Sequence, residues 1–292
     1  MAVEYSNVKQ GLSVAGGHSG IIISIFSTSS GNGKTITAIN LAAFLAKEGY
    51  EVCLMDLDLQ FGDVCDYLKL TPKYTLAEAQ KDFESDPEEF NAKNYLTQYT
   101  HEDLSFSVMA PPKSIDDAYR IDVSAVEKII EQLAGFDFII LDLQAVFSSL
   151  NLAMLDISAI INYVGIIDFL PSVKNFKVGY DTLIRFEYES NKIRLIENRS
   201  NSQKLIRGED VERLIGERFS HKLPNDFQSV NKSVNAGVPL MFAAPNSPLT
   251  KSFEELADSY LQPQENSSTH IEAAEEQPNR SILSKFMGML GW

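Results

Sequence analysis

Residues 20–35 read GIIISIFSTSSGNGKT, and this stretch decides the fold. Its apolar first half, residues 20–27, is rich in β-branched side chains and predicts a buried strand. After the glycine-rich segment, residues 34–48 show the apolar periodicity of a helix. A strand, a glycine-rich loop and a helix in this order form the context that a phosphate-binding loop requires.

Each residue type in the loop has a physical reason. Gly31 and Gly33 allow the backbone to approach phosphate oxygens and to present N–H donors, and the helix N-terminus adds partial positive charge. Lys34 is expected to reach the β- and γ-phosphates, and the Thr35 hydroxyl to bind Mg²⁺. The alternative is a glycine-rich turn with a solvated lysine. The order of the elements and the acidic motifs downstream both weigh against that alternative.

Acidic side chains stand at the ends of two further apolar strands. The segment LMDLDLQFGDV (residues 54–64) contains Asp56 and Asp58, and FDFIILDL (residues 136–143) contains Asp142. Open parallel sheets bind ligands at the carboxyl ends of their strands, so these acids are expected beside the loop. Any one of them alone is better explained as a helix cap or a solvated side chain. Together with a phosphate loop, they predict a carboxylate that holds the hydration shell of Mg²⁺.

Composition and charge restrict the function classes. The chain has 292 residues, 44% of them hydrophobic and 22% charged, which is enough for one large α/β domain with a sizeable core. A net charge of −15 argues against broad binding to DNA or RNA. Cys53 and Cys65 do not indicate a disulfide framework. The N-terminus has no signal pattern, and no apolar run is long enough to span a membrane, which predicts a cytoplasmic protein.

The chain alternates between short β-branched runs and longer helical stretches, which predicts a parallel sheet covered on both faces. Predicted strands are residues 20–27, 51–57, 105–109, 136–142, 160–167 and 192–198. Predicted helices are residues 34–48, 76–82, 88–97, 122–134, 150–158, 172–188, 208–216, 226–236 and 249–261. The expected organisation is a flexible lead-in (1–19), an α/β domain (20–261), an acidic disordered tether (262–280) and an amphipathic tail (281–292).

Several motifs together resemble the MinD/ParA group of deviant P-loop ATPases. They are the phosphate loop, DLDLQFGD, MAPP (109–112), FDFIILD, ENRSN (197–201) and LPNDFQSVNKSVNAGVPL (223–240). Within the group they look most like the TadZ/CpaE branch of pilus-assembly localisation ATPases. The resemblance covers residues 20–261 and implies an α/β fold, the three-layer α/β/α P-loop NTPase with a mostly parallel central sheet. TadZ/CpaE proteins usually carry an N-terminal receiver-like domain, which residues 1–19 are too short to hold.

The resemblance also implies ATP and Mg²⁺ as cofactors and assigns residues to them. The loop residues expected to bind ATP are Ser30, Gly31, Asn32, Gly33, Lys34, Thr35 and Ile36. The residues expected around the adenine base are Asn198, Arg199, Pro224 and Asp226. The residues expected at the metal site are Thr35, Asp56 and the Walker B acid Asp142. The residues expected to be catalytic are Lys34 and Asp58, and Asp58 is the one expected to position the attacking water. Asn40 matches a helix asparagine of the family, unless it is merely a polar residue of an apolar helix.

One loop residue departs from the family pattern. The pattern reads Lys-Gly-Gly-x-Gly-Lys-Thr, and its first lysine reaches the partner's phosphates across an ATP-bound dimer, but Ser29 stands at that position here. A serine carries no charge and cannot span the distance, whereas an arginine finger in analogous enzymes contributes about 10³–10⁵ in rate. We therefore expect nucleotide binding with slow hydrolysis. Gln144 is a second departure, because this position after the Walker B acid is often Pro or Gly.

The end of the chain, ILSKFMGMLGW, has an amphipathic pattern. The apolar residues that fall largely along one side of a predicted helix are Ile282, Leu283, Phe286, Met287, Met289 and Leu290. The helix is too short to span a bilayer, but it could lie in the interface with Trp292 at headgroup depth. MinD proteins end in a similar helix. The alternative is a tail that docks on its own domain or on a protein partner.

These inferences lead to one expected function and two alternatives. We expect a MinD/ParA-like protein that forms a homodimer with ATP and localises pilus or secretion machinery, as a peripheral protein on the inner face of the cell membrane. The first alternative is a nucleotide-binding scaffold with negligible ATPase activity that serves as an interaction platform. Chromosome or plasmid partition is disfavoured, because it requires a basic DNA-binding surface; no nucleic-acid partner is expected.

Overall fold

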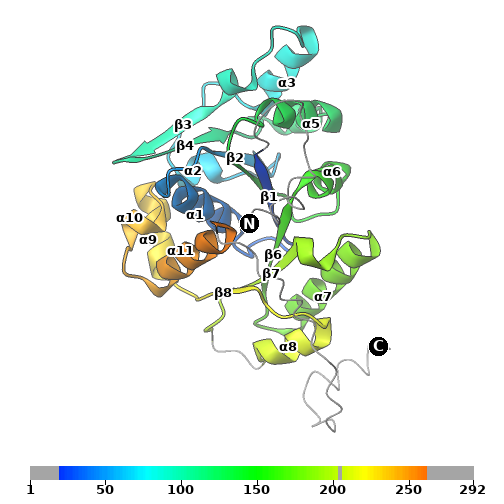
Figure 1. Ribbon diagram of the computed structural model, residues 1–292, viewed down its shortest axis with the longest axis vertical. Helices are drawn as coiled ribbons and strands as arrows, with labels where there is room; N and C mark the ends of the chain where they lie inside the picture. The colour runs from blue at the N-terminus through cyan, green and yellow to red at the C-terminus, as the bar shows by residue number, and fades with distance from the viewer. Residues whose placement is uncertain (1–19, 203–205, 262–292) are drawn as a thin grey trace, which may run out of the picture.

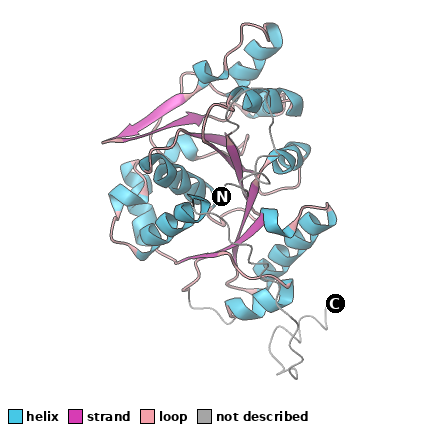
Figure 2. Ribbon diagram, viewed as in Figure 1, coloured by secondary structure: helices cyan, strands magenta, loops and turns pink. Residues whose placement is uncertain are grey.

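An eight-stranded sheet forms the middle layer of the fold, with helices on both faces (Figures 1 and 2). The structure is a computed structural model that describes residues 20–202 and 206–261. Across the sheet the strand order is β3-β4-β2-β5-β1-β6-β7-β8. The strands are β1 (Ile21–Phe26), β2 (Val52–Leu57), β3 (Thr97–His101), β4 (Leu104–Met109), β5 (Phe138–Leu143), β6 (Ile160–Ile166), β7 (Ile193–Asn198) and β8 (His221–Leu223).

Neighbouring strands in this sheet are parallel except for β3 and β4, which form an antiparallel hairpin at one edge. β2 and β5 are buried along their whole length, which explains their near-continuous apolar sequences. β1 lies between β5 and β6, so the loop after Phe26 leaves the sheet near its centre. The parallel order brings the carboxyl ends of β1, β2 and β5 to the same edge, where open sheets bind ligands.

Two helical layers cover the sheet (Figure 1). One face carries α1 (Lys34–Lys47), α2 (Val64–Tyr67), α9 (Phe227–Ala236), α10 (Leu240–Ala243) and α11 (Pro248–Leu261). The other carries α3 (Leu76–Ser85), α5 (Val123–Gln132), α6 (Ser149–Ile157), α7 (Leu170–Arg185) and α8 (Gly208–Ile215). The sheet separates two apolar cores, one under each layer, as the predicted three-layer fold requires. The connections contain α4 (Ile115–Ala118) and the short 3₁₀ helices η2 (Ala92–Tyr95) and η3 (Ser190–Lys192).

The six predicted strands correspond to β1, β2, β4, β5, β6 and β7, but the predicted helix at 88–97 is wrong. Asn91 accepts a hydrogen bond from the Lys93 N–H and caps only the single turn of η2. β3 follows at once, because Tyr99 is buried and packs on Phe106 of β4, with ring centroids 4.9 Å apart. Pairing with β4 therefore overrides the local helical pattern. β3 and the three-residue strand β8 have no predicted counterpart.

The lead-in (1–19), the tether (262–280) and the amphipathic tail (281–292) lie outside the described residues. Among the described helices, none combines the length and the apolar composition of a membrane span.

Candidate functional site

The loop between β1 and α1, with the first turn of α1, contains the predicted phosphate-binding residues, and Ser30 is exposed on the loop. Gly31 and Gly33 have left-handed backbone conformations, with φ of 75° and 89°. Gly33 is the N-cap residue of α1 and has no side chain to accept hydrogen bonds from the first helical turn. Those N–H donors, together with the partial positive charge of the helix N-terminus, form a cradle for an anion.

Side-chain hydrogen bonds hold this loop in place. The buried Ser27 hydroxyl donates to the Ser29 carbonyl (2.8 Å) and accepts from the Asn32 amide (2.8 Å). The Thr28 hydroxyl pairs with the Tyr163 hydroxyl (2.9 Å) and donates to the Asn175 carbonyl (3.1 Å). The loop is therefore fixed to β6 and α7 as well as to itself.

Asn198, at the end of β7, contacts the phosphate loop directly. Its amide donates to the Asn32 carbonyl at 2.8 Å. A Cβ atom at Gly33 would lie 2.3 Å from Asn198 Nδ2, so only glycine suits both the space and the φ angle at this position. Asn198 Oδ1 accepts from the N–H of Arg199 (2.8 Å), and Arg199 is itself left-handed, with φ of 56°. Two residues predicted for the adenine site are thus coupled to the phosphate loop.

Asp56 and Asp142 are register partners on the neighbouring strands β2 and β5. Both are buried on the face of the sheet that α1 covers, because alternate residues of each strand belong to that core. Asp56 accepts hydrogen bonds from the N–H groups of Asp58 (3.2 Å) and Val64 (3.0 Å). Burial and the Asp142 charge nevertheless raise the pKa of Asp56 well above its usual range.

Asp142 has no comparable support. Both carboxylate oxygens are buried, and no described residue donates a hydrogen bond of normal geometry to either. Burial raises the pKa of Asp142 to about 7, while the nearby Thr35 hydroxyl and the Lys34 charge act in the opposite direction. Buried polar atoms are almost always hydrogen-bonded, so each exception needs an explanation. A hydrated cation held at this position would provide the missing partners.

Lys34 is 8% exposed, and no described carboxylate lies within 4.0 Å of its amine. Asp58 Oδ1 is also buried without a partner among the described residues. A buried ammonium beside unpaired carboxylates fits a polyphosphate with Mg²⁺, because Mg²⁺ binds one or two carboxylates together with water and phosphate oxygens. The described ranges contain no group of three His, Cys, Asp or Glu side chains arranged as a metal cage.

Gly62 is a site residue whose role the sequence did not reveal. A Cβ atom at Gly62 would lie 2.5 Å from both carboxylate oxygens of Asp56. The chain after β2 therefore turns back over Asp56 at van der Waals contact, just before α2 begins at Val64. The glycine of the DLDLQFGD motif is the signal that could have identified this contact.

The residues predicted around adenine lie at the ends of β7 and β8. These strands end side by side, so Pro224 follows β8 next to Asn198. Asp226 is the N-cap of α9 and accepts hydrogen bonds from the Ser229 N–H (3.0 Å), the Ser229 hydroxyl (2.6 Å) and the Ser247 hydroxyl (2.8 Å). The bonds from Ser229 are the main cause of its lowered pKa. Its carboxylate is therefore occupied by capping in this structure.

Three further positions have structural contacts. Ile36 packs against the core on the α1 side of the sheet. Asn40 links α1 to α10, because its amide donates to the Ile36 carbonyl (2.8 Å) and its oxygen accepts from the Leu240 N–H (2.8 Å). Asn40 therefore has structural contacts within its helix and with α10, as expected for the alternative of a polar residue in an apolar helix. The Gln144 carbonyl accepts from the Asn151 amide (2.8 Å), so α6 fixes the loop after β5.

A sequence profile described as the CobQ/CobB/MinD/ParA nucleotide binding domain matches residues 23–240. The chain belongs to this family. The matched segment runs from β1 to the start of α10 and includes the phosphate loop, Asp56, Asp142 and Asn198. It therefore contains every side chain that the geometry above brings together at the carboxyl edge of the sheet.

Individual relatives agree with membership in the MinD/ParA family. The septum site-determining protein MinD of Thermotoga maritima is 26% identical over 247 residues, covering 82% of this chain and 87% of that protein. A ParA family ATPase from Chlorobium tepidum TLS has a TM-score of 0.74 at 23% identity, covering 82% of this chain and 98% of that one. MinD from Pyrococcus horikoshii OT3, solved with Mg-ADP, has a TM-score of 0.70 at 20% identity, covering 82% of this chain and 95% of that one. These structures confirm the predicted P-loop NTPase fold.

Proposed function

We propose that this chain is an ATP-binding protein of the MinD/ParA type, similar to the TadZ/CpaE branch. The observation that carries the proposal is the buried Asp142 carboxylate, which accepts no hydrogen bond of normal geometry from the described residues. It lies in the field of the buried Lys34 and beside an uncapped helix N-terminus. An unpaired buried carboxylate is unfavourable, and Mg²⁺ with a polyphosphate would compensate both it and Lys34. The Mg-ADP complex of the Pyrococcus horikoshii relative supports the same kind of ligand.

The position of each residue supports the role proposed for it. The backbone of the loop, residues 30–36, would surround the phosphates, with Lys34 pairing with their outer oxygens. Thr35 and Asp142 would hold Mg²⁺ and its water ligands, with Asp56 supporting Asp142 from the next strand. When bound, Mg²⁺ neutralises charge that develops on the phosphate oxygens. Asp58, unpartnered at Oδ1, would orient the attacking water.

The proposed adenine site is formed by the ends of β7 and β8. It would contain Asn198, Arg199, Pro224 and Asp226. Because the Asn198 amide donates a hydrogen bond to the Asn32 carbonyl, binding of the base beside Asn198 would affect the position of the phosphate loop. The Asp226 carboxylate is engaged in capping α9, so its contribution would be to fix the chain that faces the base.

Hydrolysis is proposed to be slow because Ser29 lacks a charge. The Ser27 hydroxyl makes two hydrogen bonds to the Ser29 main chain. It accepts from the Ser29 N–H (3.1 Å) and donates to the Ser29 carbonyl (2.8 Å). A short side chain on a fixed backbone cannot carry positive charge to a partner's phosphates. The missing cation accounts for about 10³–10⁵ in rate in analogous enzymes, whereas one charge-assisted hydrogen bond contributes about 1.5–3 kcal/mol to binding. The same serine favours the second candidate, a nucleotide-binding scaffold with negligible turnover.

Large apolar side chains are exposed after the carboxyl ends of four strands. Phe61 follows β2, Val146 follows β5, Phe169 follows β6 and Phe227 follows β8, with exposed fractions between 45% and 71%. Exposed apolar side chains that gather on one side of a molecule indicate an interaction surface. We therefore place the contact between two ATP-loaded copies at this edge of the sheet, across the nucleotide.

The proposed location is the cytoplasmic face of the cell membrane, reached through residues 281–292 at the end of the 262–280 tether. The support is the amphipathic sequence pattern, since both segments lie outside the described residues. Two weakly binding tails on one dimer would bind through avidity. Relatives are named for septum site determination and for a MinC:MinD complex of Aquifex aeolicus, which favours a protein partner. The proposed cargo here is pilus or secretion assembly machinery.

Two measurements on one sample test the nucleotide part. Calorimetry should show Mg-ATP binding, and steady-state phosphate release should stay far below that of a vigorous P-loop ATPase. Absence of binding refutes the proposal as a whole. Rapid turnover refutes only the role given to Ser29, and binding with no turnover at all favours the scaffold.

Sedimentation with liposomes tests the membrane part. The full chain and a Phe286→Glu/Leu290→Glu variant are compared with Mg-ATP, with Mg-ADP and without nucleotide. Pelleting that requires both Mg-ATP and the intact apolar tail supports the proposed cycle. Pelleting that depends on neither contradicts it.

A further inference from the structure

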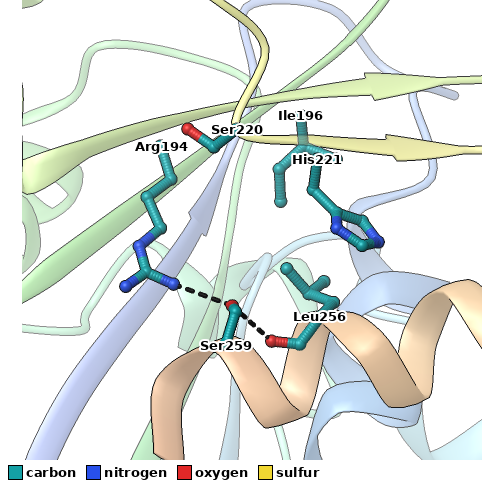
Figure 3. A pocket seen from close by; sticks show the side chains of 6 residues that line it. All are labelled: Arg194, Ile196, Ser220, His221, Leu256 and Ser259. Carbon is teal, nitrogen blue, oxygen red and sulfur yellow. Dashed lines mark hydrogen bonds between the residues drawn. The ribbon is translucent and has the colours of Figure 1, made fainter. Parts of the chain in front are cut away.

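A small pocket lies between α11 and the strands β7 and β8 (Figure 3). It has a volume of about 180 Å³ and is lined by Arg194, Ile196, Ser220, His221, Leu256 and Ser259. Arg194 stands near the amino end of β7, and His221 is the first residue of β8. The pocket is therefore at the end of the sheet opposite to the phosphate loop, and the proposed nucleotide site does not use it.

Arg194 is the cation of this pocket. Its Nη1 donates to the Ser259 hydroxyl at 3.0 Å, and the guanidinium stacks 4.4 Å from the centroid of the Tyr260 ring. No described carboxylate lies within 4.0 Å of it. A guanidinium has five N–H donors in a planar fork that matches a carboxylate. Ser259 and Tyr260 are uncharged partners, so neither neutralises the guanidinium.

A buried donor without a partner lies beside Arg194, outside the residues that line the pocket. Asn162 is its register partner on β6, on the same face of the sheet, and is completely buried. Asn162 Nδ2 has no hydrogen-bond partner among the described residues, while Oδ1 accepts from the Tyr260 hydroxyl at 2.6 Å. Tyr260 thus contacts both donor groups. A buried donor without a partner needs an explanation, and here it adjoins a guanidinium that also lacks an anionic acceptor.

The rest of the lining defines what kind of anion fits. Ile196 and Leu256 form an apolar wall between the polar ends of the pocket (Figure 3). His221 Nε2 is engaged by the carbonyl (2.7 Å) and hydroxyl (3.0 Å) of Ser252, and burial lowers its pKa. The histidine is therefore neutral at pH 7, and Arg194 contributes the one positive charge of the lining.

We propose that this pocket binds a small carboxylate, whose oxygens pair with Arg194 and whose alkyl part packs on Ile196 and Leu256. A volume of about 180 Å³ limits the occupant to a short-chain acid or a single acidic side chain. An acidic side chain is available within the same chain, because residues 262–280 follow α11 in the sequence. They contain Glu265, Glu272, Glu275 and Glu276. The carboxylate chemistry is the same in both cases.

The first test uses sodium butyrate as the probe and sodium chloride at equal ionic strength as the reference. Thermal unfolding is followed against butyrate concentration, and we expect a saturable rise in the midpoint of the full chain or, if a glutamate of the chain fills the pocket, of the glutamine variant described below. In Arg194→Gln the butyrate response should weaken at least tenfold, and Arg185→Gln, an exposed arginine of α7, should leave it unchanged. Ser259→Asp places a carboxylate beside Arg194 and should abolish the response in a folded protein.

A second variant separates the two sources of the carboxylate. In it the four glutamates of residues 262–280 are replaced by glutamine within the full chain. A butyrate response that appears only in this variant shows that a glutamate of the chain occupies the pocket, and an equal response in both chains shows that a free acid does. The proposal is overturned if neither chain responds, or if the response persists in both Arg194→Gln and Ser259→Asp. Mg-ATP binding should be unaffected throughout, so failure here is distinguishable from failure of the nucleotide site.

Discussion

Asp56 and Asp142 occupy the same register on adjacent parallel strands, yet only Asp56 accepts backbone hydrogen bonds from the described residues. Two neighbouring buried carboxylates repel each other, so their ionised forms are unfavourable without a cation. The backbone of the DLDLQFGD segment supports Asp56 and leaves Asp142 for a ligand. This asymmetry distinguishes a carboxylate that shapes the site from one that the proposed Mg²⁺ would contact.

The titration of Asp142 should control the stability of the nucleotide-free protein. Burial raises the pKa of Asp142 to about 7, above the value of about 3.9 for an unfolded aspartate. The folded state retains a proton that the unfolded state has lost, so stability falls as pH rises from about 4 through about 7. Asp142→Asn removes this linkage. The free energy of unfolding of Asp142→Asn should therefore fall less steeply with pH than that of the unsubstituted chain. The two slopes should differ by about 1.4 kcal/mol per pH unit within that window.

Urea titrations at several pH values in this window, without nucleotide or Mg²⁺, measure the two slopes. The same variant should also lose the Mg²⁺ dependence of ATP binding. Equal slopes for Asp142→Asn and the unsubstituted chain would show that Asp142 is not the group that carries the extra proton.

Substitution of Gly62 should destabilise the fold through Asp56. In Gly62→Ala the new methyl group would meet both carboxylate oxygens at 2.5 Å, which forces the loop or the buried acid to move. We expect a loss of about 1–3 kcal/mol in the free energy of unfolding, as for other overpacked sites. Gly135→Ala is the matched control, because its methyl group would meet only Lys93 Nζ, at 3.6 Å. If urea unfolding gives the same midpoint for both variants, the close approach to Asp56 is not real.

Removal of the Asn198 amide should loosen the phosphate loop. Asn198→Ala loses the 2.8 Å hydrogen bond to the Asn32 carbonyl, and Mg-ATP binding should weaken by about 0.5–1.5 kcal/mol. Gly33→Ala should be more severe, because it combines a left-handed φ with a 2.3 Å contact to Asn198 Nδ2. The double variant Gly33→Ala/Asn198→Ala lacks the Asn198 amide and therefore this contact. In the Asn198→Ala background, Gly33→Ala should therefore reduce Mg-ATP affinity less than it does alone, but still measurably because of the left-handed φ. Strictly additive effects on affinity would contradict the contact.

Restoring the cation at position 29 should accelerate hydrolysis. In Ser29→Lys we expect at least a tenfold rise in phosphate release, because the lysine supplies charge to the developing transition state. The affinity for Mg-ATP should change much less. Ser190→Lys, at an exposed position before the amino end of β7, adds the same charge away from the nucleotide site and should leave the rate unchanged. A Ser29→Lys rate that stays at the level of the unsubstituted chain would mean that the serine is not what limits turnover.

The sequence predicted those parts of the fold whose signals are local. The strand, loop and helix of residues 20–48 each carry their own pattern, and Asp142 ends a fully apolar run. The helix predicted at 88–97 failed because β3 is specified by its pairing with β4 across a turn at Glu102, which has a left-handed φ of 52°. β8 has only three residues and forms because β7 offers a free edge.

The sequence named the residues of the candidate site but not the contacts between them. Asn198 and Asn32 are 166 residues apart in the chain, and nothing in either motif says that they touch. Gly62 lies inside a quoted motif, but its contact with Asp56 depends on how the chain turns after β2. The pairing of Thr28 with Tyr163 likewise arises because β6 is placed beside β1. Such contacts follow from the order of strands in the sheet, which local patterns do not encode.

Calorimetric titration of Mg-ATP into the full chain and into a Lys34→Ala variant tests the central claim most directly. If the cradle at the start of α1 holds a triphosphate, the full chain should bind Mg-ATP and the variant should not, while both remain folded. A full chain that releases no heat and shows no stabilisation by Mg-ATP, or a variant that binds equally well, would contradict the account.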